Sequence, residues 1–97
     1  MLYDIELPDF LEKIKGLLLS VLNIDDLGFE LAMDTKLISG LGTNNLALSS
    51  IDYVDFLVCI ENEYNIVFDF NVRIYTVRDI YDYIIAYKTQ ERSEMNE

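Results

Sequence analysis

The sequence predicts an all-α protein, a small bundle of three main helices with one or two short helices between them. Three segments carry apolar residues at the spacing of an amphipathic helix,. The one stretch that alternates like a strand, residues 65–72, has no second strand with which to pair. The hydrophobic fraction of 52% is enough for a modest core in a single domain of 97 residues,.

The first helix is expected from about Pro8 to Leu22. Proline suits the first turn, because the N–H that it lacks would have no helical partner there. Gly16 either weakens the helix by about 1 kcal/mol relative to alanine or permits close packing. The apolar face of this helix comprises Phe10, Leu11, Ile14, Leu17, Leu18, Val21 and Leu22.

Residues 23–48 form a long connection. Long stretches without structure are uncommon in compact domains, so we expect a short turn of helix and several apolar anchors in it. Turns are expected at Gly40, Gly42 and Asn44-Asn45. The expected anchors are Ile24, Leu27, Phe29, Leu31, Leu37, Ile38, Leu41, Leu46 and Leu48.

The central helix is expected from about Ser50 to Tyr64. One of two serine hydroxyls can cap its start, and Asn65 can end it because asparagine tolerates the left-handed conformation. A stripe expected to face the core comprises Tyr53, Phe56, Leu57, Ile60 and Tyr64. A second stripe comprises Ile51, Val54, Val58 and Glu61, with Asp55 and Asn62 beside it. A small domain rarely buries a helix all round, so the second stripe is predicted to be apolar surface bordered by negative charge.

Residues 65–72 are expected to cross the core as an extended segment, with a short turn at 72–75. The last helix should begin at Thr76, where Asp79 three residues later gives a loose capping box. Its expected core face comprises Val77, Ile80, Tyr81, Ile84 and either Ile85 or Tyr87. The helix should end near Lys88, so that 1–88 form one domain and 89–97 a disordered polar tail.

The net charge of −11 disfavours nucleic acid as a partner and favours proteins with basic patches,. Between Lys36 and Arg73 there is no basic residue at all. The alternative explanation for this charge is solubility alone. The chain has no histidine, which excludes Ser-His and Cys-His nucleophile pairs and most zinc sites, and no metal site is expected,.

The location of the protein is expected to be the cytoplasm. No run of apolar residues reaches the roughly 20 that a membrane span needs. Acids stand near the N-terminus, where a secretory signal would carry bases,. The single cysteine, Cys59, cannot form an internal disulfide and is expected to be a small packed hydrophobe,.

Several short motifs, taken in order, resemble the acyl and peptidyl carrier proteins. Ser49-Ser50-Ile51-Asp52 resembles the Asp-Ser-Leu signature of that family, in which the serine begins the second helix. The further matching motifs are Glu61-Asn62-Glu63-Tyr64, the extended piece at 65–68, and Thr76-Val77-Arg78-Asp79-Ile80. The similarity is strongest from Leu46 to Ile84, and the order of helices extends it over nearly the whole chain.

The resemblance implies an acyl-carrier-like bundle that is a carrier and not an enzyme. Ser50 would bear a 4′-phosphopantetheine arm, transferred from coenzyme A by a phosphopantetheinyl transferase, with cargo held as a thioester. The protein would act as a monomer in fatty-acid, polyketide, nonribosomal-peptide or related synthesis. The surface for the transferase and for loading and processing enzymes would comprise Ile51, Asp52, Val54, Asp55, Val58, Glu61 and Asn62.

The sequence departs from the family pattern at three positions. Ser49 replaces the usual aspartate, Ala47 stands where many members have glycine, and Asn62 stands where some have an acid. Two other functions remain open. The chain could be an unmodified acidic helical adaptor, in which Ser50 only caps the helix, or a small acidic enzyme, although no catalytic constellation is found.

Overall fold

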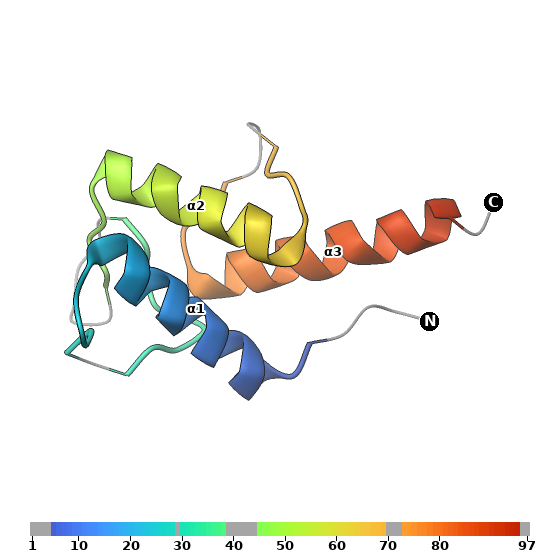
Figure 1. The fold of residues 1–97 in the computed structure, drawn as a ribbon. Helices are drawn as coiled ribbons and strands as arrows, with labels where there is room; N and C mark the ends of the chain where they lie inside the picture. Colours follow the sequence, from blue (N-terminus) through green and yellow to red (C-terminus); the bar gives the residue numbers. More distant parts are fainter. Residues whose placement is uncertain (1–4, 29, 39–44, 70–72, 96–97) are drawn as a thin grey trace.

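The computed structural model describes residues 5–28, 30–38, 45–69 and 73–95. Within these ranges the chain forms three helices and no strand (Figure 1). The helices are α1 (Leu7–Leu22), α2 (Ser50–Tyr64) and α3 (Val77–Met95). The prediction of a small all-α bundle is therefore confirmed, although no additional short helix occurs in the described ranges.

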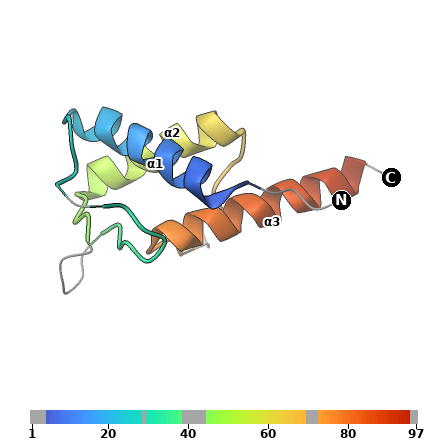
Figure 2. The same ribbon diagram turned by 90° about the horizontal axis from the view of Figure 1, so that it is seen from below.

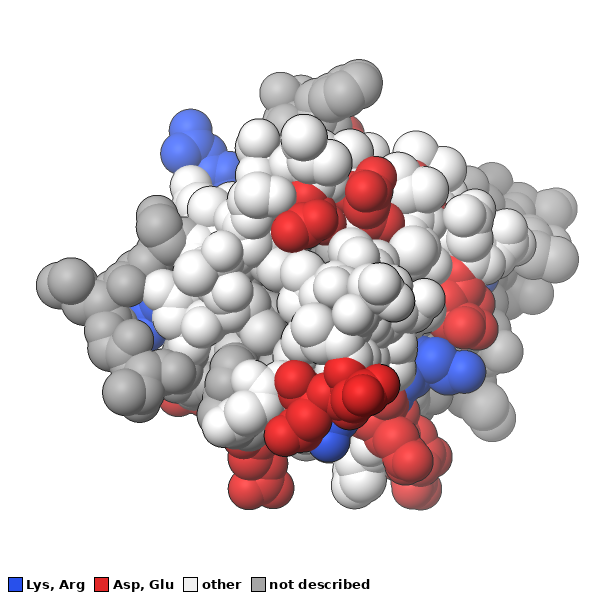
Figure 3. Space-filling view, turned by 60° about the vertical axis from the view of Figure 1, so that its left-hand side comes forward, with Lys and Arg blue, Asp and Glu red and all other residues white. Residues whose placement is uncertain are grey.

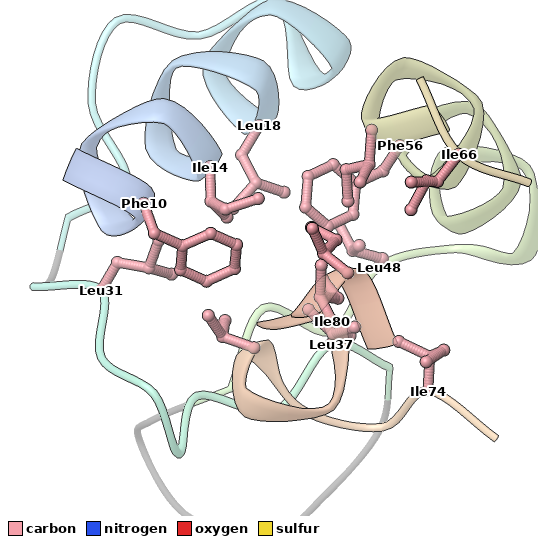
Figure 4. Packing of buried hydrophobic residues seen from close by; sticks show 13 residues of the cluster. Phe10, Ile14, Leu18, Leu31, Leu37, Leu48, Phe56, Ile66, Ile74 and Ile80 are labelled. Atoms are coloured by element: carbon pink, nitrogen blue, oxygen red, sulfur yellow. The ribbon is translucent and has the colours of Figure 1, made fainter. Parts of the chain in front are cut away.

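The three helices enclose one core. α1 and α2 pack against each other, and α3 crosses both and extends past their ends (Figures 1 and 2). Side chains from all three helices and from the segments between them converge in the centre (Figure 4). The buried apolar residues are Phe10, Ile14, Leu18, Leu31, Leu37, Leu48, Phe56, Ile60, Ile66, Ile74, Val77, Ile80 and Ile84.

The expected apolar face of α1 is confirmed, because its members are either fully buried or packed against the core. Gly16 is exposed, and a Cβ built on it would have no atom within 4 Å. Close packing therefore does not explain this glycine. None of the three helices, within the residues described, combines the length and apolar composition needed to cross a bilayer.

The connection from α1 to α2 is held by apolar anchors and by hydrogen bonds to the start of α3. Leu31, Leu37 and Leu48 are buried, whereas Ile24 is exposed, so its expected role as an anchor is wrong. The remaining anchors in the described ranges, Leu27, Ile38 and Leu46, are partly buried against the core. Phe29, Leu41 and the turns expected at Gly40, Gly42 and Asn44 lie outside the described residues.

The short helix expected in this connection is absent from the part that the structure describes. The backbone there forms a turn, in which the Thr35 N–H donates to the Ala32 carbonyl at 3.2 Å, and several of its other groups bond to the start of α3. Thr35 is fully buried, and its carbonyl accepts the Val77 N–H at 3.1 Å, while the Met33 carbonyl accepts the Arg78 N–H at 2.8 Å. The Leu37 N–H donates to the Tyr75 carbonyl at 2.8 Å. The connection thus supplies acceptors to the first turn of α3, whose N–H groups have no partner within the helix.

The start of α3 is the expected capping box. Asp79 Oδ2 accepts the Thr76 N–H at 3.0 Å, and Thr76 Oγ1 accepts the Asp79 N–H at 3.3 Å. The expected end near Lys88 is wrong, because the helix continues to Met95. Residues 89–95 contain neither glycine nor proline and include good helix formers, so nothing in them stops the helix,. Residues 96–97 of the expected tail lie outside the described residues.

Candidate functional site

Two adjacent serines at the start of α2 have different structural roles. Ser49 is the N-cap: its backbone is extended and its Oγ accepts the Asp52 N–H at 3.1 Å. Ser50 is the first helical residue and is exposed. Among the described residues, no group forms a hydrogen bond with the Ser50 hydroxyl. The interpretation of Ser50 as the cap is therefore wrong, and its hydroxyl remains accessible at the helix start.

The turn that leads into this site has an unusual backbone. Ala47 has φ of 50°, in the left-handed region that glycine normally occupies,. Its N–H donates to Asn45 Oδ1 at 2.9 Å, and the next residue, Leu48, is buried and donates its N–H to the Leu37 carbonyl at 2.9 Å. The chain therefore enters α2 in a fixed direction, with alanine in the conformation that a glycine would favour.

The two faces predicted for α2 are confirmed by burial. Phe56 and Ile60 are fully buried, and the other members of the core stripe, Tyr53, Leu57 and Tyr64, are partly buried against them. On the opposite face the exposed fractions are 73% for Ile51, 56% for Val54 and 45% for Val58. We call these three residues the apolar stripe of α2.

Polar and acidic side chains border the apolar stripe. Asp55 and Asn62 are exposed, and Asp52 is half-buried in the first turn. Figure 3, which turns the left-hand end of the bundle forward, shows acidic side chains bordering an uncharged area and only a few basic ones. The surface near the start of α2 thus combines apolar area with negative charge.

Glu61, which was expected to join the partner surface, has a contact within the molecule. Its side chain is half-buried, and Oε2 accepts the Phe68 N–H at 2.7 Å. The carboxylate therefore holds the segment that follows α2. Glu61 differs in this from Asp55, whose side chain is exposed and for which the structure gives no such contact.

The segment 66–69 has no regular secondary structure and is also held by Tyr83 of α3. Ile66 is buried, whereas Val67 is 64% exposed, as the alternation in the sequence predicts. The Tyr83 hydroxyl donates to the Val67 carbonyl at 2.6 Å and accepts the Asp69 N–H at 3.0 Å. The Tyr83 ring lies 4.8 Å from the Phe68 ring, centroid to centroid. Burial raises the pKa of Tyr83 above its ordinary value. Tyrosine is protonated near neutral pH even without this shift, so the hydroxyl can donate.

A pocket of about 340 Å³ lies between α2 and this segment. α2 contributes apolar side chains together with Tyr53 and the Glu61 carboxylate, and the segment contributes the Phe68 ring and the Asp69 carboxylate. The lining residues are Tyr53, Val54, Leu57, Val58, Glu61, Phe68 and Asp69. The Tyr53 hydroxyl donates to the Ile74 carbonyl at 3.0 Å, and burial is the main reason that the pKa of Tyr53 is raised. The sequence pattern did not point to Phe68 or Tyr83 as part of this site.

The site's most distinctive chemical feature is one exposed primary hydroxyl at the positive end of a helix. The N-terminus of a helix stabilises an attached or bound phosphate through unpaired N–H groups and the helix dipole. In the described part of the chain, no group of three or more potential metal-ligating side chains is found. Comparison with protein families, curated proteins and solved structures finds no match for this chain.

Proposed function

We propose that this protein is a carrier that holds acyl or aminoacyl intermediates as thioesters on a 4′-phosphopantetheine arm attached to Ser50. The observation that carries this proposal is the division of roles between the two serines. Because Ser49 caps α2, Ser50 is exposed and its hydroxyl is not occupied by a contact within the described chain. The resemblance of the surrounding motifs to carrier proteins selects this modification among those that a serine can undergo.

The local electrostatics suit a phosphodiester at this position. Ser50 stands in the first turn of a helix of 15 residues, where the backbone N–H groups carry partial positive charge,. The transferase would supply the chemistry of attachment, so Ser50 needs no activating base in its own chain. The absence of histidine is consistent with this role.

The departures from the family pattern leave the local geometry compatible with it. Serine and aspartate are both favoured N-cap residues, so Ser49 can replace the usual aspartate in that structural role. Ala47 adopts the left-handed backbone for which glycine would be favoured. Asp52, in the first turn of α2, remains as an acid close to Ser50.

The apolar stripe of α2 suits brief encounters with several enzymes. Val54 lies one turn from Ser50, on the same side of the helix. Acids beside such a stripe accelerate association with basic partners, while the apolar contact governs how long the complex lasts. The partners proposed are a phosphopantetheinyl transferase and loading and processing enzymes with basic patches, met by a cytoplasmic monomer.

The second candidate function is an unmodified acidic adaptor. The exposed apolar stripe favours it, because that surface exists whether or not Ser50 is modified. Mass spectrometry of the protein purified from its own host separates the two functions. A mass increase by one phosphopantetheine group, located on Ser50, supports the carrier. A bare Ser50 under conditions of active synthesis supports the adaptor.

A further inference from the structure

An open groove follows the exposed side of α1, between this helix and residues 30–31. Its volume is about 830 Å³. The groove runs along α1 from Leu7 to Leu19, which is about 18 Å, or roughly three helical turns, at the rise of an α-helix,. Leu31 is buried, whereas Leu7 is 43% exposed. The apolar residues that line the groove are Leu7, Pro8, Leu11, Leu19 and Leu31.

Gly16 lowers the surface of α1 at the edge of this groove. It also lines a second groove, which α1 shares with Glu63 of α2. A glycine within a helix is less stable than an alanine, and a Cβ at Gly16 would have no atom within 4 Å,. Packing inside the molecule therefore does not require this glycine. The missing side chain instead leaves room for a partner to approach the α1 backbone closely.

The charged side chains of the groove are acidic on balance. Glu12, Lys15 and Glu30 line it, and all three are exposed. Within the described residues none of them forms an ion pair or a hydrogen bond, whereas Lys13 in the second groove is paired with Glu63 at 3.6 Å. The net charge of −11 attracts a basic partner and repels a second copy of the chain,.

We propose that this groove docks an amphipathic helix of a partner protein. The apolar face of that helix would cover the leucines of the groove, and its flanking lysines or arginines would meet Glu12 and Glu30. Helices that bind in grooves use apolar anchors one turn apart, and the length of this groove accommodates about three turns. The groove contains neither Ser50 nor any residue of the apolar stripe of α2, so the inference does not rest on the proposed function.

NMR titration of the unmodified, isotope-labelled protein tests the docking. The probe is a synthetic helical peptide of leucine and lysine, with the leucines along one face. The largest amide shifts should occur at Leu11, Gly16 and Leu31. A peptide with glutamate in place of lysine, and one with alanine in place of leucine, should each bind at least tenfold more weakly. Shifts confined to Ile51, Val54 and Val58, or no binding at all, would overturn the proposal.

Gly16→Leu fills the space at the edge of the groove and should weaken binding of the leucine–lysine peptide at least tenfold. Leucine is a good helix former, so urea denaturation should show no loss of stability that could explain the weaker binding. Ala86→Leu, which adds a leucine at an exposed position of α3, is the control and should bind as the wild type does. Equal affinities for the two variants would contradict the site.

Analytical ultracentrifugation of the protein alone tests the other occupant, a second copy. The wild type should sediment as a monomer at all concentrations. A dimer that Gly16→Leu abolishes would show that the groove binds another copy of this chain and would overturn the basic partner. These experiments use unmodified protein, so a failure of the carrier proposal is seen separately.

Discussion

Ser49 Oγ accepts the Asp52 N–H at 3.1 Å, and this bond closes the first turn of α2. Removing the acceptor by Ser49→Ala should lower the free energy of unfolding by about 1 kcal/mol. Ser49→Asp should preserve stability, because aspartate caps equally well and its charge suits the helix start. Ser50→Ala should have little effect, because alanine is a good helix former and Ser50 is exposed. Urea denaturation measures the free energy of unfolding of the three variants. If Ser50→Ala lowers it as much as Ser49→Ala does, Ser49 is not the N-cap.

Two opposite substitutions, Ala47→Gly and Gly16→Ala, should both stabilise the protein. A left-handed backbone costs a residue with a Cβ roughly 1–2 kcal/mol, so Ala47→Gly should raise the free energy of unfolding by about 0.5–1 kcal/mol after glycine's entropy is subtracted. Gly16→Ala should add about 0.5–1 kcal/mol, since the added methyl enters open space within α1,. Thermal and urea unfolding measure both. Destabilisation by Ala47→Gly would contradict the left-handed turn before the site.

The two faces of α2 predict unequal costs for similar truncations. Ile60 is fully buried, so Ile60→Ala should cost roughly 2–5 kcal/mol, a large share of the stability of a small domain,. Val58 is 45% exposed, and Val58→Ala should cost much less. Equal shifts of the urea midpoint for the two variants would mean that the helix is rotated relative to the described packing.

The acids beside the apolar stripe should set the rate of encounter with the transferase. Asp55→Lys should slow transfer at low salt, and added salt should slow the wild type, because rim charges act mainly on association and are screened. Asp82→Lys, which makes the same charge change at an exposed position of α3, is the control. Val54→Asp should mainly accelerate dissociation, since apolar contact is expected there.

Stopped-flow binding across a salt series separates these effects. If the association rate does not depend on salt and Asp55→Lys does not change it, the acidic residues beside the apolar stripe are only solvated and do not steer partners. Glu61→Lys is a poorer probe of encounter than Asp55→Lys, because the Glu61 carboxylate also holds the Phe68 N–H.

Local signals predicted the bounds of α2 correctly and the start of α3 to within one residue. Capping contacts join residues that are only a few positions apart, so they can be predicted from the sequence. The examples are the serine before α2, the asparagine after it and the Thr76–Asp79 pair. Helical spacing also separated the buried stripe of α2 from the exposed one. The position of Ser50 on the surface follows from the same local chemistry.

Contacts between residues far apart in the sequence could not be predicted from the spacing of residue types. Tyr83 is 16 residues from Val67, and no spacing rule indicates that its hydroxyl binds that carbonyl. The length of the connection before α2 predicts a short helix, because the sequence does not reveal its backbone hydrogen bonds to the start of α3. The end of α3 was placed too early because polar composition was taken as a stop, although no breaker follows Lys88,.

The most direct test of the carrier proposal is incubation with coenzyme A and a promiscuous phosphopantetheinyl transferase, followed by intact-mass and peptide mass spectrometry. The wild type and Ser49→Asp should each gain one phosphopantetheine group, located on Ser50, and Ser50→Ala should gain none. Circular dichroism should show that Ser50→Ala remains folded, so that its failure reports the missing hydroxyl. Modification of Ser49 with Ser50 untouched, or an unmodified wild type beside a modified control carrier, would contradict the proposal.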